Sequence, residues 1–305
     1  MSEPAEPSRV PLRAPAAVPY ERPGIVHERH GSVPAGDLQR KLTWPERVAN
    51  LGAVRKLTIL VALAVAWQLY AAWLDNALMF PTFSAMVAAW ADAFVHGALL
   101  QRVLVSLRVL LMGYAAGIAA AAVLTFAAST SRVGADLLET LTAMFNPLPA
   151  IALLPLALLW FGLGSASIVF VLVHAVLWPV ALNTYGGILA VSPTLRMVGR
   201  NYGLKGLGYA VKILIPAAFG SILTGLKIGW AFAWRTLIAA ELVFGVASGS
   251  GGLGWYIYEN KNALEIPAVF AGLFTVIVIG IAVENLIFRW IEKRTLRRWG
   301  MQTSA

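Results

Sequence analysis

Residues 166–190 read ASIVFVLVHAVLWPVALNTYGGILA, an apolar run without Asp, Glu, Lys or Arg. A helix needs about 20 such residues to cross a hydrocarbon core of about 30 Å, so this run predicts a membrane-spanning helix. Further apolar stretches predict spans at about 57–75, 103–128, 137–160, 217–244 and 264–288. The sequence therefore predicts an all-α membrane protein with six transmembrane helices.

The composition of the whole chain agrees with this class. Of its 305 residues, 59% are hydrophobic and only 13% are charged, whereas a soluble domain has about 25% charged residues. The net charge of +9 does not indicate a nucleic acid partner, because Lys and Arg gather near the ends of the predicted spans. The chain has no cysteine, which excludes disulfides and thiolate metal sites.

The distribution of Lys and Arg also orients the spans. Basic residues occupy the segment 1–56, the loops at 129–135 and 192–212, and the end of the chain at 289–298. The opposite connections carry only Lys261. Because cytoplasmic loops are enriched in Lys and Arg, both termini are expected in the cytoplasm.

Segments outside the spans differ in composition. Residues 1–40 are rich in Pro, Glu, Arg, Ser and Ala, which is typical of a disordered tail. Residues 41–56 mix apolar and charged side chains and predict an amphipathic lead-in on the inner membrane surface. The transmembrane domain is expected at 57–290, followed by a cytoplasmic tail at 291–305. Near-helical apolar spacing within 79–101 predicts an outer amphipathic helix along the membrane.

The inner loop at 192–212 has the signals of a short basic helix. The hydroxyl of Ser192 can cap free amides, and Pro193 suits the first helical position. Gly203 can adopt the left-handed conformation that ends a helix. A second short helix is expected to follow and to reach Pro216.

This loop resembles the cytoplasmic signature of binding-protein-dependent ABC importer permeases, which is Gly, nine residues, Ile, any residue, an aliphatic residue and Pro. The matching residues are Gly203, Ile213, Ile215 and Pro216. The family pattern begins with Glu-Ala-Ala, where this chain has Met197, Val198 and Gly199. In the family the loop forms a coupling helix that sits in a cleft of the ATPase, and the absent glutamate would remove one polar docking contact. The resemblance implies that coupling depends on Met197, Arg200, Gly203, Lys205, Ile213 and Pro216.

Further stretches are similar to the nitrate, sulfonate, taurine and bicarbonate branch of this family and extend over about 60–295. They are SLRV (106–109) with GY (113–114), NPLP (146–149) with LWFGLG (159–164), NT (183–184) with Gly187, and WR (234–235) with AE (240–241) and GGLG (251–254). The resemblance implies a type I importer-like permease, in a bacterial inner membrane, that moves a small anion by alternating access. It further implies a second permease subunit, in a homodimer, together with ATPase subunits and an extracytoplasmic substrate-binding protein.

The chain itself is not expected to be an enzyme. It has no Gly-x-x-x-x-Gly-Lys-Ser/Thr loop, so ATP and Mg are expected in the partner ATPase and no cofactor is expected here. The glycines at 249–254 follow no predicted strand and lack the lysine of a phosphate-binding loop. Membrane lipid is the other expected contact. An ATP-independent secondary transporter or channel is the alternative, although internal repeats and ion sites at membrane depth are not apparent.

Two charged residues at membrane depth, Arg235 and Glu241, are candidates for function. They are six positions apart, which places them about 240° apart on a helix, so they cannot pair along one face. Arg235 could contact an anionic substrate or form a structural ion pair with Glu139 or Glu284. Together with Asn146, Arg235 and Glu241 form the candidate translocation path or gate, and a structural role for Glu241 is also open.

Other residues within the spans predict packing and shape. The solitary His174 is expected to hydrogen-bond to a neighbouring helix rather than to bind metal. Gly113 and Gly117, four residues apart, permit another helix to approach closely, and a subunit interface is one place where this contact could lie. The third span is expected to be distorted by Pro147, Pro149 and Pro155.

Overall fold

The computed structural model describes residues 52–244 and 251–295. Every regular element in these ranges is a helix, which confirms the all-α prediction. The chain divides into two units, 1–58 and 59–305, and the first contributes to the described part only the beginning of helix α2 (Gly52–Leu74). Because α2 begins at Gly52, it includes the end of the expected lead-in at 41–56. The expected tail at 1–40 and most of the C-terminal tail lie outside the described residues.

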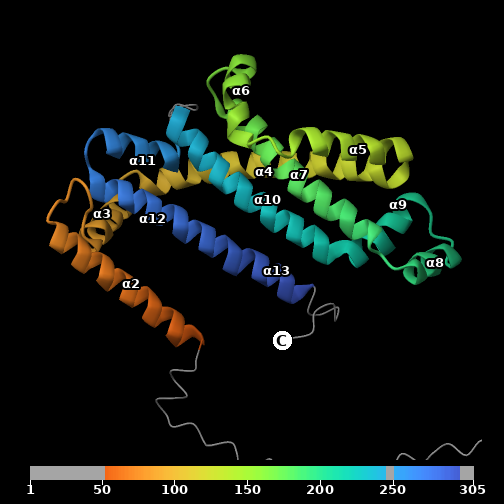
Figure 1. Ribbon diagram of the computed structural model, residues 1–305, viewed down its shortest axis with the longest axis horizontal. Coiled ribbons are helices and arrows are strands. Elements are labelled where there is room, and N and C mark those ends of the chain that lie inside the picture. The colour runs from red at the N-terminus through yellow and green to blue at the C-terminus, as the bar shows by residue number, and fades with distance from the viewer. Residues whose placement is uncertain (1–51, 245–250, 296–305) are drawn as a thin grey trace, which may run out of the picture. The chain divides into compact units, whose positions relative to one another are not determined.

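Five helical stretches in the described part are long and apolar enough to cross a membrane, and a bent pair of helices gives a sixth when it is counted as one span. This agrees with six transmembrane helices and corrects some of their bounds. The five are Gly52–Leu74, Leu99–Thr130, Ser165–Leu189, Gly206–Val243 and Ile266–Arg294. Figure 1 shows them as α2, α4, α7, α9 with α10, and α12 with α13.

The third predicted span, 137–160, is not one straight helix. Helix α5 (Arg132–Phe145) ends at the NPLP stretch. A short 3-10 helix, η2 (Ala150–Leu153), then leads into α6 (Leu154–Phe161), and this second segment lies at an angle of 87° to α5. Pro147 and Pro149 lack the amide hydrogen that a continuous helix requires, which explains the break. Figure 1 shows α6 turning sharply away from α5. The predicted distortion is therefore confirmed, and it is larger than a kink.

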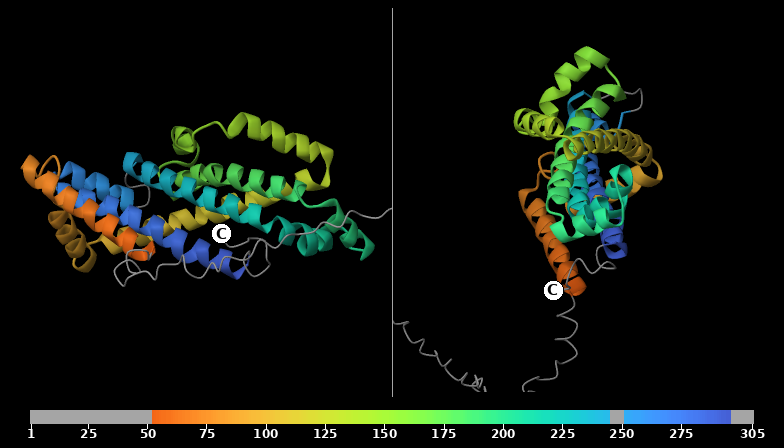
Figure 2. Two further views of the ribbon diagram at one scale, coloured as in Figure 1. Left: turned by 60° about the horizontal axis from the view of Figure 1, so that its bottom comes forward. Right: turned by 90° about the vertical axis from the view of Figure 1, so that its right-hand side faces the viewer.

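Helix α7 (Ser165–Leu189) lies between α4 (Leu99–Thr130) and α10 (Ile215–Phe244) and contacts both along much of its length (Figure 2). Glycines make this approach possible. A Cβ on Gly113 would lie 2.5 Å from Cβ of Leu172, and a Cβ on Gly117 would lie 2.6 Å from Cβ of Val176. The predicted close approach at Gly113 and Gly117 is confirmed, but it is a contact of α4 with α7 of the same chain.

Helix α3 (Phe83–Val95) confirms the helix expected within 79–101. Its first turn is capped by Thr82, whose Oγ1 accepts a hydrogen bond from the amide of Ala85. The indole of Trp67 in α2 donates a hydrogen bond of 2.9 Å to the carbonyl of Pro81. Rings from Trp67, Phe80, Phe83 and Phe270 then join α2, the beginning of α3 and α12 (Ile266–Ala282).

The inner loop forms the short helix α8 (Pro193–Asn201) at the predicted place. Ser192 Oγ accepts from the amide of Leu195, and Gly203 has φ of +72°. The amide of Gly203 bonds to the carbonyl of Arg200, and the amide of Leu204 bonds to that of Gly199, as in a glycine-terminated helix.

The second short helix of the loop does not stop before the fifth span. Helix α9 (Gly206–Tyr209) continues through a π-helical turn, η3 (Ala210–Leu214), directly into α10. A π turn inserts one extra residue into a helix without ending it, so the expected boundary at Pro216 is absent. One continuous helix, the long helix, therefore runs from Gly206 to Phe244.

The last span is also longer than predicted. Helix α11 (Leu253–Asn262) precedes α12, which continues through a π-helical turn, η4 (Val283–Phe288), into α13 (Arg289–Arg294). Lys227 of α10 forms an ion pair of 2.9 Å with Glu292 of α13. This pair joins two helices that lie far apart in the sequence.

Adjacent glycines of α7 allow a matched test of its packing against α10. A Cβ on Gly187 would lie 2.5 Å from Cβ of Ser221, whereas a Cβ on Gly186 would meet nothing within 4 Å. We expect Gly187→Ala to lower the free energy of unfolding by about 1–3 kcal/mol through overpacking. Gly186→Ala should be neutral or slightly stabilising, because alanine favours helix. Thermal unfolding of the detergent-solubilised variants measures both, and equal melting temperatures would contradict the packing.

Candidate functional site

A cavity of about 580 Å³ lies where the α5–α6 helix is broken, against α7 and α10. It brings together Asn146 and Arg235, two of the three residues predicted for a translocation path. Glu241, the third, is not among its lining residues. Those are Asn146, Pro147, Leu148, Pro149, Ala150, Ile151, His174, Ala175, Trp178, Pro179, Phe232, Arg235, Thr236 and Ala239.

Arg235 provides the charge of this cavity. Its Nε donates a hydrogen bond of 3.0 Å to the carbonyl of Ala231, and its guanidinium lies 5.0 Å from the ring centre of Phe232. Within the described residues it forms no ion pair, so the expected pairs with Glu139 or Glu284 are not formed. The physical reason is position, because Arg235 is on the face of α10 that lines the cavity. No acidic residue is among the described lining residues.

His174 and Trp178 add polar atoms to the same cavity. They are four residues apart on α7, which places them on one face, and their ring centres are 6.0 Å apart. The carbonyl of Phe145 faces the His174 ring, but neither ring nitrogen makes a hydrogen bond of standard geometry, and neither does Trp178 Nε1. The interaction expected from His174 to a neighbouring helix is thus limited to this contact with Phe145 at the end of α5. The four-residue spacing was the sequence signal that could have paired these two residues.

Glu241 lies in a separate buried cluster that joins α4, α10 and α11. Its side chain is 3% exposed. Its carboxylate accepts hydrogen bonds from Ser106 Oγ and from the amide of Gly254, both of 2.8 Å. Ser106 Oγ also accepts a hydrogen bond of 2.7 Å from the amide of Leu253. The first amides of α11 have no side-chain cap from their own segment. Ser106 and Glu241, from two other helices, accept hydrogen bonds from these amides instead.

The GGLG stretch at 251–254 is explained by this cluster rather than by phosphate binding. A Cβ on Gly252 would lie 2.1 Å from Glu241 Oε1, and a Cβ on Gly254 would lie 2.6 Å from Glu241 Cβ. Only glycine allows the backbone to approach the carboxylate this closely. The sequence contained Ser106, Glu241 and these glycines but did not indicate that they meet.

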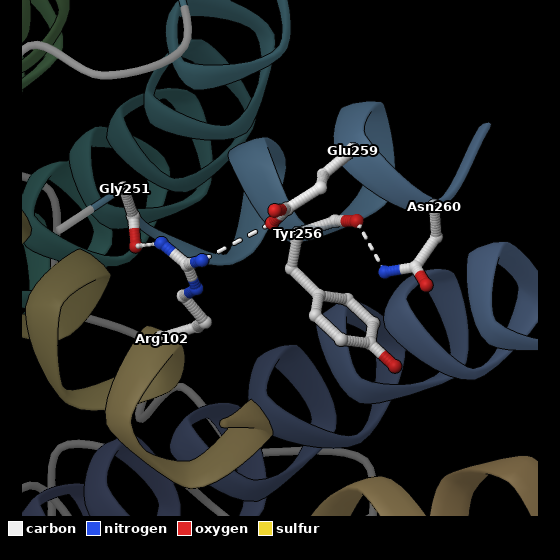
Figure 3. Close-up of polar contacts among 5 residues, drawn as sticks. All are labelled: Arg102, Gly251, Tyr256, Glu259 and Asn260. Atoms are coloured by element: carbon white, nitrogen blue, oxygen red, sulfur yellow. Dashed lines mark hydrogen bonds and ion pairs between the residues drawn. The ribbon is translucent and has the colours of Figure 1, made fainter. Parts of the chain in front are cut away.

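A second polar contact fixes α11 on its exposed side. Arg102 of α4 donates a hydrogen bond of 2.9 Å to the carbonyl of Gly251 and forms an ion pair of 3.1 Å with Glu259 (Figure 3). Next to it, Asn260 donates to the carbonyl of Tyr256. Burial, reinforced by the negative charge of Asp92, raises the pKa of Tyr256, so its hydroxyl stays protonated at neutral pH.

The predicted coupling residues occupy α8 and the beginning of the long helix. Met197, Arg200 and Lys205 are exposed, and Pro216 is the second residue of α10. Ile213 packs on α8, because a Cβ on Gly199 would lie 3.0 Å from its Cγ1 and 2.8 Å from the ring of Tyr209.

Arg196 is a structural residue of α8 that the sequence did not single out. Its guanidinium donates hydrogen bonds to the carbonyls of Ile188 and Val191, near the C-terminal end of α7. The carbonyl of Ile188 also accepts a hydrogen bond from the amide of Val191, and the Arg196 contact adds to this capping at the end of α7. Arg196 therefore ties α8 to the end of the central helix.

Residues 113–297 match the family described as binding-protein-dependent transport system inner membrane component. The matched range extends from the middle of α4 to the end of the described residues. It includes α8, the cavity and Glu241 with its partner Gly254, whereas Ser106 lies before the matched range.

Several relatives are similar over most of the chain. The taurine transport system permease protein TauC of Escherichia coli is 26% identical over 260 residues, which cover 84% of this chain and 93% of that protein. SsuC of Bacillus subtilis, named for aliphatic sulfonates transport, is 26% identical over 88% of this chain and 96% of its own length. The nitrate import permease protein NrtB of Synechocystis sp. is 31% identical over 57% of this chain and 63% of its own length.

Loss of the Ser106 hydroxyl tests the cluster around Glu241. We expect Ser106→Ala to lower the free energy of unfolding by about 1–3 kcal/mol, because the Leu253 amide and the buried carboxylate each lose a partner. Ser129→Ala is the matched control, since Ser129 Oγ bonds only to the carbonyl of Thr125 in its own helix. Thermal unfolding in detergent measures both, and equal effects would contradict the role assigned to Ser106.

Proposed function

Because the chain belongs to the family of binding-protein-dependent transport system inner membrane components, we propose that it is the permease of an ATP-driven importer for small oxyanions. The named substrates of its relatives, taurine, aliphatic sulfonates and nitrate, all carry an oxyanion group. A separate ATPase would bind ATP and Mg, and an extracytoplasmic binding protein would deliver the anion. A second copy of this chain would complete the membrane pathway as a homodimer.

The observation that carries the substrate proposal is the cavity around Arg235. Its described lining contains the guanidinium of Arg235 and no acidic side chain. It also contains three ring nitrogens, on His174 and Trp178, that form no standard hydrogen bond with the described residues. A buried donor without a partner costs about 1–3 kcal/mol, and an oxyanion that accepts from it would remove this cost. The cavity volume is also in the usual range for small-molecule sites.

We propose that Arg235 attracts the anion and that His174, Trp178 and Asn146 orient it. The planar guanidinium can donate two parallel hydrogen bonds to two oxygens of a sulfonate or nitrate. The site has to release its cargo, and a single charge in an open, mostly apolar cavity favours passage over tight retention. Glu241 is assigned a structural role, because its carboxylate is occupied by Ser106 and the amide of Gly254.

Helix α8 is proposed to couple this cavity to the ATPase. It is fixed to α7 through Arg196 and to the beginning of the long helix through Tyr209 and Ile213. Movement of α8 would therefore be transmitted to both helices that line the cavity. The π turn at 210–214 is a weak point in the helix ladder where the long helix could bend.

The proposed orientation places α8 and both termini in the cytoplasm and α11 outside. The described basic residues support it, because Arg132, Arg196 and Arg200 lie at the α8 end of the spans. The α11 end has Lys261 and Arg102, and Arg102 is paired with Glu259. In this orientation α8 faces the ATPase. The cluster around Glu241 then closes the outer end of α10.

Exposed apolar residues of α8 provide a test of ATPase binding. Met197 and Tyr202 are 57% and 81% exposed. We expect Met197→Ser combined with Tyr202→Ser to reduce copurification of the ATPase at least about tenfold, since aromatic and methionine anchors dominate such interfaces. Quantitative pull-down from membranes measures it.

A control replaces equally exposed residues elsewhere. Leu78 and Met79 are 66% and 71% exposed in the connection between α2 and α3. Leu78→Ser with Met79→Ser should leave copurification unchanged. A folded wild-type chain that recovers no ATPase would favour an ATP-independent secondary transporter or channel.

Removal of the cavity charge tests the substrate proposal. We expect Arg235→Gln to reduce anion uptake by the reconstituted complex about 10- to 100-fold, the loss of one charge-assisted hydrogen bond. Arg235→Lys should retain part of the uptake, because the charge remains while the two-pronged geometry is lost. Arg294, which lies over Trp290 at the same 5.0 Å, is the matched control for Arg→Gln. Uptake that is unchanged in Arg235→Gln would exclude a role in transport.

A further inference from the structure

A second cavity, of about 570 Å³, lies at the α8 end of the protein. It is bounded by the end of α4 and beginning of α5, the end of α7, α8, and the beginning of the long helix. Three arginines line it, each from a different structural setting: Arg132 in the first turn of α5, Arg196 inside α8 and Arg200 in the last turn of α8. The cavity therefore connects the α4–α5 turn to the coupling helix.

Among the described residues of its lining, no acidic side chain balances the positive charge of this cavity. Arg196 uses part of its guanidinium on the carbonyls of Ile188 and Val191. Arg132 and Arg200 are exposed and form no ion pair within the described residues. Three like charges around one space repel each other, and a bound anion would reverse this repulsion.

Polar and apolar features at the cavity specify the kind of anion. The hydroxyl of Tyr209, which lines it, is buried and has no hydrogen-bond partner among the described residues. Phe126 and Leu189, also in the lining, are 52% and 60% exposed and belong to the ends of two membrane spans. A ligand with a phosphate group and an apolar part would fit both features, with the phosphate at the arginines and the acyl chains along the exposed apolar side chains.

We propose that this second cavity binds a phosphate group, supplied by an anionic phospholipid or by free phosphate, and thereby ties α8 to the α4–α5 turn. The cytoplasmic position of the cavity rests on the proposed orientation. In that orientation it meets the leaflet that is rich in anionic lipids, and basic cavities between spans on this side suit their head groups. Arginine suits the site because its planar donors match phosphate oxygens.

Binding can be measured on the purified full-length chain in detergent, without the ATPase. We expect added dioleoylphosphatidylglycerol, but not dioleoylphosphatidylcholine, to raise the melting temperature saturably. Arg132→Gln combined with Arg200→Gln should weaken this binding at least about tenfold, since each basic residue near an anionic lipid contributes about fivefold. Arg132→Lys with Arg200→Lys should retain most of it, and high salt should weaken it.

The matched control removes two arginines from another exposed site. Arg289→Gln with Arg294→Gln changes the net charge equally on α13, away from the cavity lining, and should bind as the wild type does. Free phosphate is the source if inorganic phosphate stabilises the protein saturably and the Arg132→Gln with Arg200→Gln variant loses this effect. The lipid is the source if phosphatidylglycerol alone stabilises the protein. The proposal is overturned if neither probe stabilises the wild type, or if both Arg→Gln pairs respond alike. That failure would leave the ATPase copurification result unaffected.

Discussion

Close packing of α7 against both α4 and α10 determines the arrangement of the other helices. Hydrocarbon gives helices no hydrophobic reason to associate, so small residues that allow backbone contact take over that role. Gly113 and Gly117 of α4 admit side chains of α7, and Gly187 of α7 admits Ser221 of α10. A Cβ on Gly225 would likewise lie 2.9 Å from the carbonyl of Pro179. Three helices thereby behave as one packed body.

This packing gives the long helix from Gly206 to Phe244 its proposed mechanical role. Its first turns contact α8, its second half carries Arg235 into the cavity, and near its C-terminal end Glu241 binds the beginning of α11. A displacement at α8 cannot be absorbed by loose packing along α7, because the glycine contacts leave no free space. The break in the α5–α6 helix supplies the opposite wall of the cavity, and backbone that is irregular at membrane depth is tolerated where it lines such a space.

The local features of this fold could be predicted from the sequence, and the long-range ones could not. Ser192, Pro193 and Gly203 determine α8 through their own backbone preferences, and Pro147 and Pro149 determine the break in the same way. The partners of Glu241 could not be predicted, because Ser106 and Gly254 reach it only through the tertiary packing of three helices. Arg235 illustrates the same limit, since its neighbours His174 and Trp178 belong to another helix, and the sequence left a structural ion pair open.

In the proposed mechanism, ATP use by the partner changes access to the cavity around Arg235. Since the natural chain has no cysteine, Thr236→Cys would introduce a single thiol in the cavity lining, and Gly186→Cys would introduce one outside it. Labelling by a membrane-impermeant thiol reagent should be compared in the assembled complex with and without ATP and vanadate. With ATP and vanadate, labelling of Cys at position 236 should fall from one side of the membrane and rise from the other side. Labelling of Cys at position 186 should not change. Unchanged labelling at 236 in a complex that hydrolyses ATP would contradict the proposed mechanism.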